Sequence, residues 1–251
     1  MRLPPADIHG LADALLEAAA EVAEAYEVDD ASHTGDEVTP GLLAQAAAQL
    51  LDLLKRIEAG RRAPESRAGD MVREDLARLG DYGFGLLGDL GAWAARLGLE
   101  ARRHEMEMLA LPLALWLARN GGELQTLEPA VNAAAAAANQ THDTRELEAL
   151  YAMTGELIEA AAPDIRQDLE KGNPGRPWRV LNINRAILAT RTHNPGIMEE
   201  AFEVLVQNLP EEAPQFFREG MGQMEALNYP PRVREVMERY YRKWCLQRTL
   251  H

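Results

Sequence analysis

The sequence contains a single cysteine, Cys245, so the chain cannot form a disulfide within itself. Nothing in its cysteine content therefore points to an oxidising compartment. Uninterrupted apolar runs of about 18 residues, the length that spans a membrane, do not occur. Residues 1–27 have prolines near their start and carry acids throughout their apolar stretch, unlike a signal peptide. We therefore expect a cytoplasmic protein with no membrane partner.

Aromatic residues are also scarce, at 6% of the chain, and β-branched residues are few beside alanine and leucine. This composition favours helices over sheets. Hydrophobic residues make up 47% of the chain, which is too many for a disordered protein and enough for a core of one or two domains. The composition predicts an all-α fold.

Basic residues are too few to balance the acids, because 26 Lys and Arg stand against 40 Asp and Glu, a net charge of −14 at pH 7. Such a charge repels nucleic acids and anionic membranes at long range. Residues 176–251 carry 11 basic residues against 9 acids, so residues 1–175 hold a net charge of −16. Nucleic acid is therefore the least favoured partner class.

Apolar residues recur every three or four positions along most of the chain, as they do in amphipathic helices. A polar loop at 29–40 separates the first two such segments, which we expect to form a hairpin. The charged, proline-bearing stretch 61–70 resembles a linker. We therefore predict an acidic helical hairpin over residues 1–66 and a helical-repeat region over 67–251, packed continuously with the first. Pro112 is expected to kink or divide its helix.

The last third of the chain is its most regular part. Two helix-turn-helix segments follow one another there, with turns at residues 192–196 and 229–231. At an offset of 34 residues, apolar positions match apolar positions and small residues match small residues. The matched pairs are Ala186 with Gly220, Ile187 with Met221, Ile183 with Phe217, Phe202 with Val236, and Val206 with Tyr240.

This spacing resembles the tetratricopeptide repeat. With Arg179 as the first residue of a unit, Ala186, Phe202 and Pro210 match the small residue, the aromatic residue and the closing proline of that family. The resemblance covers the last third, with a fainter echo at 81–112. It implies stacked helical hairpins in a right-handed superhelix, whose concave surface holds an extended peptide or a partner's acidic tail. The departures from the family pattern are Asn182, Arg185 and Met198.

Residues 83–88, GFGLLG, match the G-x-G-x-x-G pattern of dinucleotide-binding proteins. In those proteins the glycines follow a buried strand, whereas a charged helical segment precedes them here. We therefore expect no cofactor. The small residues instead fall on one helix face, where a neighbouring helix is expected to approach closely. These residues are Gly85, Gly88, Gly91, Ala92 and Ala95.

The candidate metal and catalytic patterns are incomplete. HEMEM at 104–108 ends in Met where a zinc-protease helix has a second histidine, and the acidic loop 29–37 lacks the spacing of a calcium-binding loop. His142 and His193 lie at expected helix caps and turns, with no nucleophile in a shaped motif nearby. We therefore expect no bound metal and assign no catalytic residue.

A cluster of basic and amide side chains surrounds the first helix of the last third. On a helix, Arg179, Asn182, Arg185 and His193 share one broad stripe that could hold a carboxylate or a phosphate. We predict these four as partner-binding residues. The alternative is that the arginines form internal ion pairs that neutralise the acidic half of the chain.

These observations favour a non-catalytic protein-interaction module or scaffold that binds a peptide or protein surface, acidic groups of the partner included, in a helical groove. An alternative is a helical enzyme or small-ligand-binding protein that uses His104 or His142 and nearby carboxylates, which a discrete buried pocket would favour. A second alternative is a nucleic-acid-associated regulator that uses the basic and aromatic residues at 232–248, although a terminal capping helix explains the same pattern.

Overall fold

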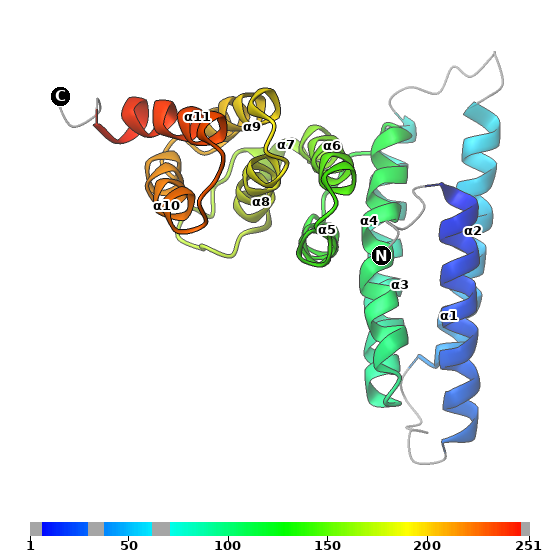
Figure 1. Ribbon diagram of the computed structural model, residues 1–251. Helices are drawn as coiled ribbons and strands as arrows, with labels where there is room; N and C mark the ends of the chain where they lie inside the picture. The colour runs from blue at the N-terminus through cyan, green and yellow to red at the C-terminus, as the bar shows by residue number, and fades with distance from the viewer. Residues whose placement is uncertain (1–6, 30–37, 62–70, 247–251) are drawn as a thin grey trace. The chain divides into compact units, whose positions relative to one another are not determined.

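The structure is a computed structural model that describes residues 7–29, 38–61 and 71–246 (Figure 1). In these ranges the chain is helical, with one isolated bridge between Leu124 and Ala161, so the all-α prediction is confirmed. None of the helices in these ranges combines the length and the apolarity needed to cross a membrane. The contacts divide the chain into unit 1, residues 1–139 and 159–162, and unit 2, residues 140–158 and 163–251.

Unit 1 is built on four helices that lie side by side, with α5 (Glu128–Gln140) after them (Figure 1). The four are α1 (Ile8–Val28), α2 (Pro40–Arg61), α3 (Met71–Arg96) and α4 (Glu100–Arg119). Each packs mainly against two neighbours, because α1 contacts α2 and α4 while α3 also contacts α2 and α4. This arrangement is a four-helix bundle. Its core consists of leucines and small residues, among them Ala12, Ala19, Leu51, Leu54, Leu76 and Leu90.

The division between the units lies elsewhere than the predicted boundary near residue 66. An amphipathic hairpin must bury its apolar face against another element, and α1 and α2 bury theirs against α3 and α4. Residues 8–61 therefore belong to the same bundle as residues 71–119. The contacts separate the chain after Asn139 instead.

Pro112 lies inside α4 and does not divide it, because the helix continues from Glu100 to Arg119. The residues from Met108 to Leu117 are all buried, so this part of α4 packs against neighbours on every side. This packing outweighs the backbone hydrogen bond that a proline removes from a helix.

Unit 2 contains two helix pairs joined by short turns, preceded by α6 and α7. The helices are α6 (Thr144–Ala160), α7 (Pro163–Arg166), α8 (Pro177–Arg191), α9 (Pro195–Asn208), α10 (Ala213–Ala226), α11 (Pro231–Tyr241) and the π-helical turn η2 (Arg242–Leu246). α8 pairs with α9 and α10 pairs with α11, while α9 also contacts α11. The expected turns at 192–196 and 229–231 lie between the helices of each pair.

Candidate functional site: a groove between α3, α4 and α5

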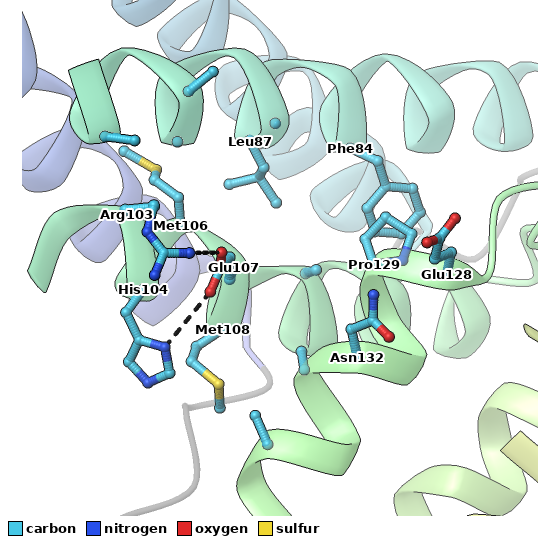
Figure 2. Close-up of a pocket in the computed structure, with 17 residues that line it drawn as sticks. Phe84, Leu87, Arg103, His104, Met106, Glu107, Met108, Glu128, Pro129 and Asn132 are labelled. Carbon is cyan, nitrogen blue, oxygen red and sulfur yellow. Dashed lines mark hydrogen bonds and ion pairs between the residues drawn. The ribbon is translucent and has the colours of Figure 1, made fainter. Parts of the chain in front are cut away.

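A groove of about 650 Å³ lies in unit 1 between α3, α4 and α5 (Figure 2). It is neither an enclosed cavity nor a flat surface, so it is partly open to solvent. Phe84 and Leu87 of α3 and Met106 and Met108 of α4 supply its large apolar side chains. Apart from Pro129, the remaining apolar lining residues are glycines and alanines: Gly88, Gly91, Ala92, Ala95, Ala110, Ala133 and Ala136.

The glycines of α3 lie on two different faces of the helix. A Cβ placed at Gly80 would lie 2.7 Å from Leu117 Cδ1, and one at Gly83 would lie 2.9 Å from Leu113 Cδ2, so these glycines allow α4 to approach closely. At Gly85 and Gly88 a Cβ would meet nothing within 4 Å. The predicted close approach of a helix is therefore wrong at Gly85 and Gly88.

The reason for this difference is the position of each residue around the helix. Gly80 and Gly83 face into the bundle, whereas Gly88 is exposed and lines the groove. Gly91 lies between the two faces, with Met106 Cβ 3.7 Å from the position that its own Cβ would take. Sequence spacing identifies a face of small residues, but it does not say whether another helix of the chain fills that face.

Polar side chains lie toward the ends of the groove. Arg103 donates hydrogen bonds to Glu100, at 2.7 Å, and to Glu107, and the Nδ1 atom of His104 lies 3.7 Å from Glu107 (Figure 2). Glu128 lies near Phe84, away from this cluster (Figure 2). An apolar centre with a polar rim is the arrangement found in surfaces that bind other proteins.

One histidine, His104, lines the groove. In the part of the chain that the structure describes, no group of three or more His, Cys, Asp or Glu side chains is placed to hold a metal ion. His104 contacts only Glu107 among the ion pairs of this region, and both side chains are largely exposed. The lining of the groove is therefore mainly apolar, with Arg103, His104 and Glu107 at one end.

The four residues predicted to bind a partner have different positions in unit 2. Asn182 and Arg185 are buried, Arg179 is partly buried, and His193 is exposed. Arg179 forms an ion pair with Glu212 at 3.0 Å, and the ring of His193 lies edge-on to that of Tyr229, with 5.0 Å between ring centres. The structure therefore does not bring the four together on one exposed surface.

Arg185 belongs to a network between α6, α8 and α9. Its guanidinium lies over the ring of Tyr151, at 4.0 Å from the ring centre, and donates a hydrogen bond to Glu200 at 2.9 Å. The Tyr151 hydroxyl donates to the same Glu200 oxygen at 2.8 Å. Burial raises the pKa of Tyr151, and the hydrogen bond from Tyr151 is the main reason that the pKa of Glu200 is lowered.

Asn182 is engaged in the same way, since its amide donates to the carbonyl of Trp178 at 2.9 Å and accepts from Asn208 at 2.8 Å. These contacts correspond to the internal alternative that the sequence left open for this cluster. The acids that pair with Arg179 and Arg185 are Glu212 and Glu200, which lie in unit 2 and not in the acidic N-terminal half.

The Glu200 network predicts a weak dependence of stability on pH. The folded state lowers the pKa of this carboxyl from its usual 4.5, so the stability that it contributes is present above pH 4.5 and is lost as the pH falls through the lowered value. Replacing Tyr151 with phenylalanine removes the main cause of the lowered pKa. We expect this variant to lose less unfolding free energy than the parent between pH 7 and pH 3, as measured by urea unfolding.

The difference should stay below about 1 kcal/mol, because the Glu200 side chain is 62% exposed and water screens its interactions. A Glu203→Gln variant controls for the general loss of acids, since Glu203 bonds Tyr240 and has no part in the Tyr151 network. Equal acid sensitivity of the Tyr151→Phe variant and the parent would contradict the coupling between Tyr151 and Glu200.

A second groove, of about 630 Å³, lies in unit 2 between α8 and α10. Ile183 and Ile187 of α8 line it together with Phe216, Leu227 and Tyr229. This face of α8 lies opposite the buried Asn182 and Arg185, so these two predicted binding residues do not line this groove. The signal that could have located it is the pair Ile183 and Ile187, one helical turn apart.

Comparisons of the chain with models of protein families, with curated proteins and with solved structures found no match.

Proposed function

We propose that this protein is a protein-interaction module whose groove between α3, α4 and α5 binds an amphipathic helix of a partner protein. The observation that carries the proposal is that both α3 and α5 contribute small residues to the lining of the groove. Gly88 and Ala92 of α3 and Ala133 and Ala136 of α5 all line it. Walls lined by small side chains leave room for the large apolar side chains of a partner helix, as in other complexes in which a helix binds in a groove.

Charge supports a basic partner helix. Residues 1–139, which include the groove, carry 12 Lys and Arg against 23 Asp and Glu, a net charge of −11. Glu107 and Glu128 lie toward opposite ends of the groove itself (Figure 2). The negative electrostatic potential of these charges attracts a helix that carries Lys and Arg beside its apolar stripe, and it repels an acidic helix.

The open shape favours a helix over a small molecule. The volume of the groove, about 650 Å³, lies within the range of pockets that bind small ligands. Such pockets, however, enclose most of the ligand and place a few polar groups against it. Here the groove is partly open to solvent, and Arg103 is already paired with Glu100 and Glu107. A helix could cover the open side of such a groove, whereas a small molecule would leave part of its own surface in water.

For unit 2 we propose a tetratricopeptide-like pair of stacked hairpins. His193 and Asn228 both take positive φ angles, 56° and 49°, in the turns of the two pairs, and Pro195 and Pro231 begin the helices that follow. The turns thus recur at a spacing of 35 residues, close to the 34-residue offset of the sequence. Partner binding by Arg179, Asn182, Arg185 and His193 stays a prediction.

A substitution that fills the groove tests the proposed function. Gly88→Leu should block helix binding while leaving the fold intact, because a Cβ at Gly88 meets nothing within 4 Å and leucine favours helices more than glycine does. The probe is a fluorescent 18-residue peptide of leucine and lysine, with the leucines at helical spacing. We expect Gly88→Leu to weaken its binding at least about tenfold, measured by fluorescence anisotropy.

The matched control is Gly85→Leu, which lies one turn away on the same helix, also has free space at its Cβ, and does not line the groove. This variant should bind the peptide as the parent does. Equal affinities of the parent and both variants would overturn the proposal. If the peptide does not bind, but small apolar molecules raise the melting temperature of the parent and not of Gly88→Leu, the small-ligand alternative replaces it.

A further inference from the structure

The outer face of α2 carries no charge from Leu42 to Gln49, and the described residues do not cover it. α2 packs into the bundle through Leu43, Leu50 and Leu54, which are buried. Two further leucines are turned to solvent instead, since Leu42 is 57% exposed and Leu53 is 42% exposed. The exposed residues between them are Gln45, Ala48, Gln49 and, next to Leu53, Asp52. α2 therefore carries leucines on two faces, of which the bundle uses one.

This part of α2 is unusually poor in charge. Residues 40–51 contain no Asp, Glu, Lys or Arg, although 26% of the whole chain is charged. The first charged residue of α2, Asp52, forms an ion pair with Arg56 at 2.5 Å. Two copies of a chain with a net charge of −14 repel each other at long range, and this repulsion is weakest where the surface carries no charge.

The pattern of the face is self-complementary. Leu42, Ala46, Gln49 and Leu53 are spaced by four, three and four residues, which reads the same in both directions and matches the seam of a coiled coil. In a two-fold pair of antiparallel helices, Leu42 would face Leu53 of the partner subunit. Ala46 would face Gln49 of the partner subunit, and its small side chain would leave room for the glutamine. Because both patches are identical, this contact would occur twice in the interface.

The glutamines at the centre suit an identical partner. A glutamine amide both donates and accepts hydrogen bonds, so the same side chain can pair with its counterpart on a second copy. A polar amide within a coiled-coil seam fixes the register and orientation of the two helices. Gln45 and Gln49 lie one turn apart on this face, between the two exposed leucines. The arrangement therefore specifies one pairing of two α2 helices.

We propose that the occupant of this face is a second copy of the chain, and that the protein forms a homodimer through antiparallel pairing of α2. A basic or acidic partner is a poorer fit, since residues 40–51 offer no charge for it to pair with. The dimer interface is separate from the groove of α3, α4 and α5, because no residue of α2 lines that groove. The two proposals can therefore fail independently.

Sedimentation velocity of the full-length chain tests the dimer. The parent is expected at twice the chain mass of 27.8 kDa, whereas Gln49→Glu should sediment at the mass of a single chain. Glutamate has nearly the shape and the helix propensity of glutamine, but it places like charges together across the two-fold axis. We expect the dimer to weaken by at least about a hundredfold.

Two control variants distinguish a loss of α2 pairing from a general effect of substitution on the protein. Gln207→Glu makes the same substitution at an exposed glutamine of unit 2, and Gly88→Leu alters the groove. Both should sediment as the parent does, and circular dichroism should give the same helix content for all variants. A parent that sediments as a single chain, or a Gln49→Glu variant that stays dimeric, would overturn the proposal.

A cross-linking experiment tests the antiparallel arrangement. In a Cys245→Ser background, the paired substitutions Leu42→Cys and Leu53→Cys should allow a short bismaleimide to join two chains, seen as a doubled mass under denaturing conditions. Neither single substitution should give this product, because each would face a leucine of the partner subunit. Efficient cross-linking of the Leu42→Cys single variant would overturn the antiparallel pairing.

Discussion

Replacing Phe202 with alanine is expected to lower the free energy of unfolding of unit 2 by about 3–5 kcal/mol. Phe202 is fully buried, and its ring contacts those of Phe216, Phe217 and Tyr240 at 5.7, 5.2 and 5.1 Å between ring centres. All three contacts are edge-to-face, the geometry that stabilises aromatic pairs beyond the burial of their surface. Alanine would leave a cavity where α9, α10 and α11 meet.

Urea unfolding followed by circular dichroism measures this loss, and hydrogen exchange followed by mass spectrometry locates it. Amides of α8 to α11 should exchange faster in Phe202→Ala, while those of α1 to α4 should exchange as in the parent. Phe216→Ala is the matched control, because Phe216 is only partly buried and lines a groove. A loss for Phe202→Ala no larger than for Phe216→Ala would show that Phe202 is not the centre of the core.

Replacing Arg176 with methionine is expected to lower the same free energy by about 3–5 kcal/mol. The side chains of Arg176 and Asp168 are only 5% and 8% exposed, and two hydrogen bonds join them, from Nε to Oδ1 at 2.5 Å and from Nη2 to Oδ2 at 2.9 Å. Arg176 also donates to Glu212 at 3.2 Å and to the Asn173 carbonyl at 3.0 Å. It therefore ties the segment between α7 and α8 to the beginning of α10.

Most of the expected cost comes from the carboxylate that methionine would leave buried without its partner. A double variant, Asp168→Asn with Arg176→Met, should therefore recover part of the loss. Asparagine also tolerates the positive φ angle of 50° at residue 168. Urea unfolding of the parent, both single variants and the double variant gives the coupling energy. A loss below about 1 kcal/mol for Arg176→Met would show instead that water solvates this pair.

The aromatic cluster around Phe202 and the ionic cluster around Arg176 differ in how far the sequence alone predicts them. The sequence marked Phe202 through its match to the aromatic position of a helical repeat, and the structure places it at the centre of the core. Arg176 lies three residues before Arg179, which the sequence could assign either to a partner or to internal pairs. The structure pairs Arg176 and Arg179 with Glu212, which lies far from both in the sequence and could not be paired with them by spacing alone.

The candidate site in unit 1 was only partly accessible from the sequence. The small residues of α3 stand out because glycine and alanine recur at helical spacing in residues 85–95. Their interpretation as a helix-helix contact holds for Gly80 and Gly83, which were not among the residues singled out, and is wrong for Gly85 and Gly88. Whether another helix covers this face of small residues depends on where α5 lies. Nothing in the local sequence of α3 encodes the position of α5.

The sequence by itself determined that this protein is helical and which turns join α8 to α9 and α10 to α11. These features follow from periodicity, prolines and helix caps, which act over a few neighbouring residues. Only the tertiary structure decided which faces are buried. It joined α1 and α2 to α3 and α4, buried Asn182 and Arg185, and left open the groove beside Gly88 and the outer face of α2. Burial depends on contacts between residues distant in the chain, so a local pattern can define a face without defining what covers it.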